Sequence, residues 1–180
     1  MADNVYCYPD SDVLINKLDI RELERLHTFE KKLTMLRLLE LIDKPINGNF
    51  DFKHLKEIHR YIFQDVYDWS GKVRKVDIAK GNKFCNIRFI DSQATEIFGR
   101  IKTEKYLAGL IEPDFIKRLA YFFSEINALH PFREGNLSKD FHKSPYGKQI
   151  IMESKSYFTL FLKIIQGFTF HKIFIYSLSS

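Results

Sequence analysis

Apolar residues return every three or four positions along most of this chain. The first such pattern occupies residues 20–39, and a proline and a glycine within residues 45–48 interrupt it. This spacing places apolar side chains on one face of an α-helix, and Asp19 followed by Glu22 is a pair suited to its start. The pattern therefore predicts a long first helix that ends before residue 45.

Three later segments show the same spacing and predict three more helices. Asp51 can cap the first of these, and Asp91 or Ser92 opens the second. Residues 113–114 open the third, which ends where a proline forbids normal helical continuation. The apolar faces consist of Phe52, Leu55, Ile58 and Ile62 in the first, Ile97 and Ile101 in the second, and Phe115, Leu119, Phe122, Ile126 and Leu129 in the third.

A short β-like stretch separates two of these predicted helices. Its turn is expected at residues 80–83, whose sequence is Lys-Gly-Asn-Lys. The flanking apolar residues are Val73, Val76 and Ile78 before the turn and Phe84, Ile87 and Phe89 after it. The expected fold class is therefore mainly α with one β-hairpin, or flap.

The composition is that of an ordinary folded domain. A chain of 180 residues with 45% hydrophobic and 28% charged residues can bury one core. The net charge of +5 favours polyanionic partners in general. The lysines are scattered along the sequence and no recognition motif accompanies them, so a nucleic-acid partner is disfavoured.

The cysteine content and hydropathy favour a cytoplasmic protein. Cys7 and Cys85 are the only cysteines, and they lack the spacing of a metal site. We expect both to be reduced thiols. The sequence contains no signal-peptide pattern and no run of the ~20 apolar residues that a membrane helix needs, so no membrane partner is expected.

Residues 130–136, with the sequence His-Pro-Phe-Arg-Glu-Gly-Asn, concentrate groups suited to phosphate chemistry. His130 can take a proton near neutral pH, and the Glu134 carboxylate suits a hard cation such as Mg²⁺. Gly135 and Asn136 allow backbone N–H groups to approach an anion closely. Each residue alone also has an ordinary explanation, as a structural histidine, a solvated carboxylate or a turn.

This heptapeptide resembles the signature of the Fic family of nucleotidyltransferases, most of which are adenylyltransferases. Supporting similarity occurs at residues 8–9, 16–18, 67–71, 80–82 and 125–129. The resemblance thus extends from near the N-terminus to residue 136. It implies a Fic-type helical bundle with a β-hairpin flap.

The resemblance also implies an activity, which is transfer of AMP from ATP to a Tyr, Thr or Ser hydroxyl of a target protein. His130 would be the base, and Glu134 would hold a Mg²⁺ ion that bridges the phosphates. Phe132 would be a buried anchor. The residues expected to bind the nucleotide are Lys80, Gly81, Arg133, Gly135 and Asn136.

The hairpin would then be the flap that aligns the target segment by strand-like pairing. Phe84 and Ile87 are the residues expected to dock the target. Phe84 could equally pack beneath the hairpin, and Trp69 is expected in the core. The sequence does not predict the oligomeric state.

The sequence departs from the family pattern after Asn136. Leu137 and Ser138 replace the usual small or basic residue and the following arginine, and Phe141 replaces a second basic residue. The missing arginine normally grips the β- and γ-phosphates. The resemblance therefore implies a weakened transferase, and a degenerate Fic-like protein-binding module is the alternative.

Two explanations fit this departure: natural divergence, or a changed reading frame near Asn136. The Phe-, Ile-, Lys- and Ser-rich composition that follows favours a changed frame. We accordingly divide the chain into an N-terminal arm and helix at residues 1–50, a Fic core at 51–136, and a divergent tail at 137–180. Gly-Arg in either alternative frame of the coding DNA would support the changed frame.

A chain carrying both Leu137→Gly and Ser138→Arg restores the usual residues of the phosphate clamp. We expect it to bind ATP with Mg²⁺ more tightly than the unchanged chain, because an arginine adds charge-assisted hydrogen bonds to the phosphates. Titration calorimetry of both chains measures the difference. Equal affinities would show that the absent arginine matters little.

Overall fold

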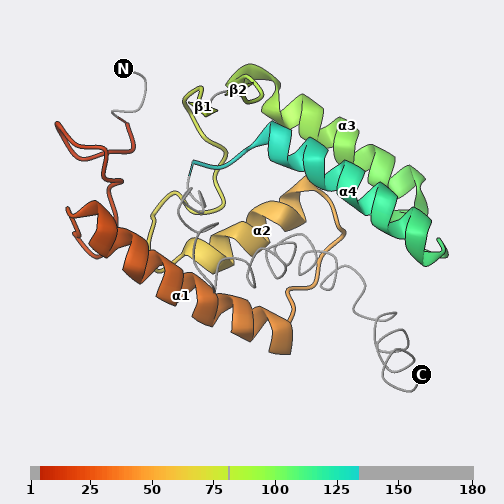
Figure 1. Cartoon of the computed structure of the whole chain (residues 1–180), viewed down its shortest axis with the longest axis horizontal. Coiled ribbons are helices and arrows are strands. Elements are labelled where there is room, and N and C mark those ends of the chain that lie inside the picture. The colour runs from red at the N-terminus through yellow and green to blue at the C-terminus, as the bar shows by residue number, and fades with distance from the viewer. Residues whose placement is uncertain (1–4, 81, 134–180) are drawn as a thin grey trace. The chain divides into compact units, whose positions relative to one another are not determined.

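The computed structural model describes residues 5–80 and 82–133, whose helices are shown in Figure 1. The elements are α1 (Leu23–Asp43), α2 (Phe52–Phe63), β1 (Ala79–Lys80), β2 (Asn82–Lys83), η1 (Ile87–Phe89), α3 (Ile90–Thr103), η2 (Lys105–Leu107) and α4 (Glu112–Leu129). The described residues up to Leu38 and from Asn47 onward belong to one compact unit, and residues 39–46 belong to a second. All elements after α1 lie in the first unit. In the described part of the chain, no helix is long and apolar enough to cross a bilayer.

Helix α1 begins later than the sequence pattern predicts. Asp19 has a positive φ of 47°, so its backbone is not helical. The buried amide of Asn16 bonds both backbone groups of Ile20, donating from Nδ2 to its carbonyl at 2.7 Å and accepting its N–H at Oδ1 over 3.0 Å. These bonds hold Ile20 outside the helix, which starts at Leu23.

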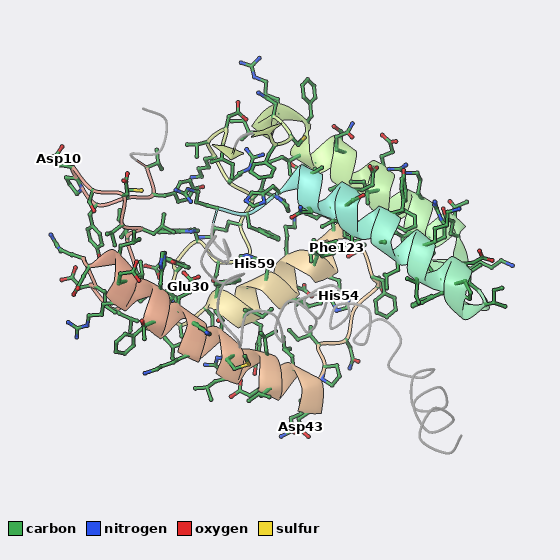
Figure 2. The ribbon with its side chains drawn as sticks, viewed as in Figure 1. Asp10, Glu30, Asp43, His54, His59 and Phe123 are labelled. Atoms are coloured by element: carbon green, nitrogen blue, oxygen red, sulfur yellow. The ribbon has the colours of Figure 1, made fainter. Side chains whose placement is uncertain are left out.

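Side-chain hydrogen bonds connect α1 to the segment that follows α2. Tyr67 donates its hydroxyl hydrogen to the Glu30 carboxylate, which comes from α1 (Figure 2), and burial raises the pKa of Glu30. About two turns further along α1, the Arg37 guanidinium binds both oxygens of Asp65, at 2.6 Å and 2.9 Å. Two polar contacts thus fix the position of α1 beside the end of α2.

The predicted cap and apolar face of α2 are largely as expected. Asp51 accepts a hydrogen bond from the His54 N–H at 2.8 Å, so it is the N-cap. Ile58 and Ile62 are buried. His54 is also buried, although the apolar pattern did not include it.

Helices α3 and α4 lie side by side (Figure 1). Ile97 and Ile101 of α3 are buried, as are Phe122 and Leu129 of α4. Arg100 of α3 also donates to the Glu125 carboxylate of α4 at 2.6 Å. The pair directs the C-terminal end of α4 towards the loop at His130.

The hairpin is much shorter than the sequence pattern predicts. Its two strands pair antiparallel, with Ala79 opposite Lys83 and Lys80 opposite Asn82. Beyond them Asp77 accepts the Ile87 N–H at 2.9 Å, and residues 87–89 form a 3₁₀ turn rather than a strand. Lys80, Asn82 and Lys83, which we expected in the turn, are therefore strand residues. The apolar residues expected in strands on either side of the turn lie outside the pair, because side-chain bonds replace the backbone ladder there.

The N-terminal arm is irregular, as expected, and it is attached to the rest of the first unit. Its described part contains a single bridge between Cys7 and Leu14. The Tyr6 hydroxyl accepts the Lys75 N–H at 2.9 Å. Trp69, which we expected in the core, is only half-buried, with its ring stacked on Tyr67.

Phe122 and Phe123 are adjacent aromatic residues in α4 with opposite exposure, 1% and 41%. Phe122→Ala leaves a cavity where a fully buried ring was, and we expect it to lower the free energy of unfolding by about 3–5 kcal/mol. Urea unfolding measures this loss. Phe123→Ala is the matched control and should cost much less, so equal losses would contradict the assignment of Phe122 to the core.

Candidate active site

The loop that begins at His130 has an unusual backbone. Helix α4 ends at Leu129, and His130 takes the left-handed conformation, with φ 44° and ψ 63°. Its N–H still donates to the Ile126 carbonyl at 3.1 Å. A histidine in this region costs energy and persists only where its surroundings impose it. The helix stop expected before Pro131 is therefore present, and it presents His130 in a constrained geometry.

The His130 ring packs against the aromatic ring at the end of the hairpin. Phe84 stacks on it with a centroid distance of 4.1 Å and an interplanar angle of 12°. The Nε2 atom of His130 has almost no exposed surface. Phe84 therefore covers one face of the candidate base.

A second histidine packs against this loop. His59 of α2 (Figure 2) stacks on Phe132 with centroids 3.7 Å apart, and on Phe63 at 4.6 Å. Phe132 is buried, as expected for an anchor. His59 was not among the predicted site residues, although its position four residues before Phe63, on the apolar side of α2, is a signal that could have found it.

The backbone at Gly71 fixes the orientation of the His59 ring. The Gly71 N–H donates to Nδ1 of His59 at 3.1 Å. Gly71 has a φ of +75°, and a Cβ atom there would lie 2.5 Å from the Lys56 carbonyl oxygen, so no other residue type fits easily. Because Nδ1 accepts this bond, a neutral His59 carries its hydrogen on Nε2.

His59 is held in its neutral form. Burial, and secondarily the charge of nearby His130, lowers the pKa of His59 from 6.5 to about 3. Both causes disfavour the imidazolium. One histidine of the two is therefore uncharged throughout the neutral range, and its role is packing and orientation.

The structure places the other predicted site residues as follows. Ile87 is half-buried at the start of η1, and Arg133 is half-buried directly after Phe132. Lys80 lies in β1. Residues 81 and 134–136, which include Glu134 as the expected metal ligand, lie outside the described residues, as do Leu137, Ser138 and the rest of the tail. In the described ranges, no group of three or more His, Cys, Asp or Glu side chains could hold a metal ion.

The fold gathers basic residues that are scattered in the sequence. A hollow of about 330 Å³ lies between α2 and the turn that follows it. Its lining consists of Lys53, Lys56, Glu57, Arg60, Gly71, Lys72 and Val73. Helical spacing and a chain reversal thus produce a local positive surface that the order of the lysines did not reveal.

Comparison with known proteins shows which family this chain belongs to. The Fic/DOC family matches residues 49–137. The chain is 38% identical over 137 residues to the probable protein adenylyltransferase y4lH of Sinorhizobium fredii, covering 75% of this chain and 70% of that protein. This chain belongs to the Fic/DOC family.

Two other relatives are similar at the same level. Identity is 42% over 136 residues with the protein adenylyltransferase VbhT of Bartonella schoenbuchensis, covering 75% of this chain. It is 38% over 132 residues with the probable protein adenylyltransferase Fic of Escherichia coli, covering 73% of this chain. The matched region spans 28% of the first relative and 65% of the second.

Solved structures have the same fold. The N-terminal Fic domain of a Bartonella effector protein from Bartonella sp. AR 15-3 superposes with a TM-score of 0.70 at 25% identity, covering 86% of this chain and 72% of that one. A Fic domain from Bartonella quintana, described with bound ADP, has a TM-score of 0.70 at 24% identity, covering 77% and 72%. The chain therefore has a mostly helical Fic fold.

The low pKa of His59 predicts a dependence of stability on pH. Between about pH 6.5 and pH 3 the unfolded chain binds a proton at His59 that the folded chain does not, so acid favours unfolding through this site. We expect the unfolding free energy of the unchanged chain, minus that of His59→Gln, to fall as pH decreases below 6.5, by up to about 1.4 kcal/mol per pH unit.

Urea unfolding of both proteins at pH 7.5, 6 and 4.5 measures this difference. It should be constant above neutral pH, because His59 is then uncharged in both the folded and the unfolded chain. Parallel pH profiles over the whole range would contradict a His59 that stays neutral in the folded chain.

Proposed function

We propose that this chain transfers AMP from ATP to a hydroxyl side chain of a target protein. The observation that carries the proposal is the constrained turn at His130, with the ring packed against Phe84 of the hairpin. The names of the relatives, which are protein adenylyltransferases, support the same reaction. The ADP held by the similar Bartonella quintana fold supports an adenine nucleotide as the donor.

His130 acts as the general base in this proposal. The imidazole takes the proton of a Tyr, Thr or Ser hydroxyl, the freed oxygen forms a bond to the α-phosphorus, and the bond to the leaving pyrophosphate breaks. His59 supports this role because it stays neutral. A second imidazolium beside His130 would oppose proton uptake by the base.

The remaining motif residues would hold the nucleotide. We assign phosphate binding to the backbone around Gly135 and Asn136, with contributions from Arg133, Lys80 and Gly81. The carboxylate oxygens of Glu134 have the chemistry that Mg²⁺ prefers, and a Mg²⁺ ion there would neutralise charge on the phosphates. Ser138 stands where the family has an arginine, so the site should lack one of its charge contacts to the phosphates.

The hairpin would be the docking flap for the target segment, with Phe84 and Ile87 beside it. Few backbone groups of its second leg are available to pair with a target strand. Cys85 already donates its N–H to the Ala128 carbonyl at 3.2 Å, and Ile87 donates to Asp77. A target strand would therefore pair with residues before Cys85.

The division into an arm with the first helix, a Fic core at residues 51–136 and a divergent tail remains our proposal. The family match over residues 49–137 supports the limits of the core. We also propose a cytoplasmic location, supported by the cysteine content alone.

A second candidate function follows from the changed residues after Asn136. Leu137 and Ser138 would remove part of the phosphate clamp, and the chain would then be a Fic-like module that binds a partner through the hairpin without chemistry. Partner capture that survives His130→Ala but is lost on changing Phe84 favours this alternative.

Labelled ATP distinguishes the two functions. With Mg²⁺ and a lysate, the unchanged chain should transfer label to protein, and His130→Ala should reduce the rate by about 10²–10⁴-fold because the base is lost. His27→Ala, on α1 and outside the site, is the matched control and should retain the rate. Absence of transfer by the unchanged chain would contradict the transferase proposal.

A further inference from the structure

A single buried arginine lies where the hairpin and the His130 loop meet. Arg74 is in the segment between α2 and β1, and its side chain has no exposed surface. A buried charge is costly unless it is paired or fully hydrogen-bonded. The arrangement of its donors shows how Arg74 meets this requirement.

The guanidinium donates to three backbone carbonyls. Nε donates to the His130 carbonyl at 2.8 Å. One terminal nitrogen donates to Val76 at 2.8 Å, and the other donates to Cys85, which directly follows Phe84. The backbone N–H of Arg74 also donates to the Pro131 carbonyl at 2.9 Å. One residue therefore joins both legs of the hairpin to the first two residues of the motif.

Asp77 completes this junction. Its Oδ1 lies 3.5 Å from a terminal nitrogen of Arg74 and accepts the Ile87 N–H at 2.9 Å. Its Oδ2 accepts from the Asn86 side chain at 2.7 Å. The carboxylate thus offsets the buried charge and fixes the second leg of the hairpin against the first.

These bonds act on the constrained residue of the site. The left-handed turn at His130 is held at its N–H by Ile126 and at its carbonyl by Arg74. Strained backbone of this kind relaxes when the surrounding contacts are lost. Arg74 also binds the carbonyl of Cys85, the residue after Phe84, so it contacts the backbone at or next to both rings of the stacked pair.

We propose that Arg74 is a positioning residue, which locks His130 in its left-handed turn and sets the Phe84 ring over the imidazole. The hairpin and the base then keep one fixed mutual position. This inference deepens the proposed function and rests on it for its catalytic consequence, whereas its structural part can be tested without any transfer reaction.

Arginine has the geometry that this role needs. Its planar fork offers five N–H donors in fixed directions, whereas the lysine ammonium is a single point at the end of a flexible stem. A lysine at position 74 keeps the positive charge but cannot reach the carbonyls of His130, Val76 and Cys85 together. Arg74→Lys therefore keeps the positive charge but removes the fork of hydrogen-bond donors, so it tests whether the donor geometry matters.

The test compares Arg74→Lys with the unchanged chain by proton NMR of the His130 ring, assigned with His130→Gln. The Phe84 ring stacked over the imidazole moves the Cε1–H resonance of His130 upfield. In Arg74→Lys we expect that resonance to return towards the position of an unstacked histidine. An unchanged resonance in folded Arg74→Lys overturns the proposal, whatever the activity.

Kinetics supply the second measurement. A displacement of about 1 Å at the base can cost ~10²-fold in rate, so kcat of Arg74→Lys should fall by about that factor while KM for ATP changes little. A normal kcat overturns the positioning role. If the unchanged chain transfers no label, the transferase proposal fails, but the NMR comparison still decides the role of Arg74.

Two further variants control for stability. Arg118 binds Glu104 through a similar two-pronged contact and precedes His130 along α4 by roughly 18 Å. Arg118→Lys should therefore leave the His130 resonance in place, and movement of that resonance would overturn the proposal. If Arg74→Lys does not fold, Asp77→Asn replaces it, and a smaller shift in the same direction is expected; no shift overturns the proposal.

Discussion

The rest of the site depends on one constraint, the burial of the Arg74 guanidinium among backbone carbonyls. A buried charge must be satisfied, and here its partners come from Val76, Cys85 and His130. These residues belong to both legs of the hairpin and to the loop after α4. Satisfying the charge therefore also brings the hairpin and the loop together, so packing and site geometry have the same physical cause.

The two histidines of the site differ because their surroundings differ. His59 is enclosed by aromatic rings and stays neutral, with its Nδ1 occupied by the Gly71 N–H. His130 lies in a left-handed turn with Phe84 on one face of its ring. His59 thus serves packing, whereas His130 is the candidate base. The two roles differ because burial and hydrogen bonding act differently on the two imidazoles.

The helices were largely predictable because their signals are local. Asp51 caps α2 as expected, and α4 stops before Pro131. The errors occur where a side chain competes with the backbone. Asn16 keeps Ile20 out of α1, and Asp77 removes the Ile87 N–H from the strand ladder. Neither competition can be read from apolar spacing, since each depends on residues brought together by the fold.

The sequence by itself determined the family, the helical class and the motif that begins at His130, because a contiguous heptapeptide and a helical repeat are both local patterns. The tertiary structure alone decided that Phe84 covers His130, that His59 stacks on Phe132 and that Arg74 joins the hairpin to the motif. Those contacts join residues far apart in the chain. Long-range packing and the burial of one charge select them, and neither leaves a periodic signal in the sequence.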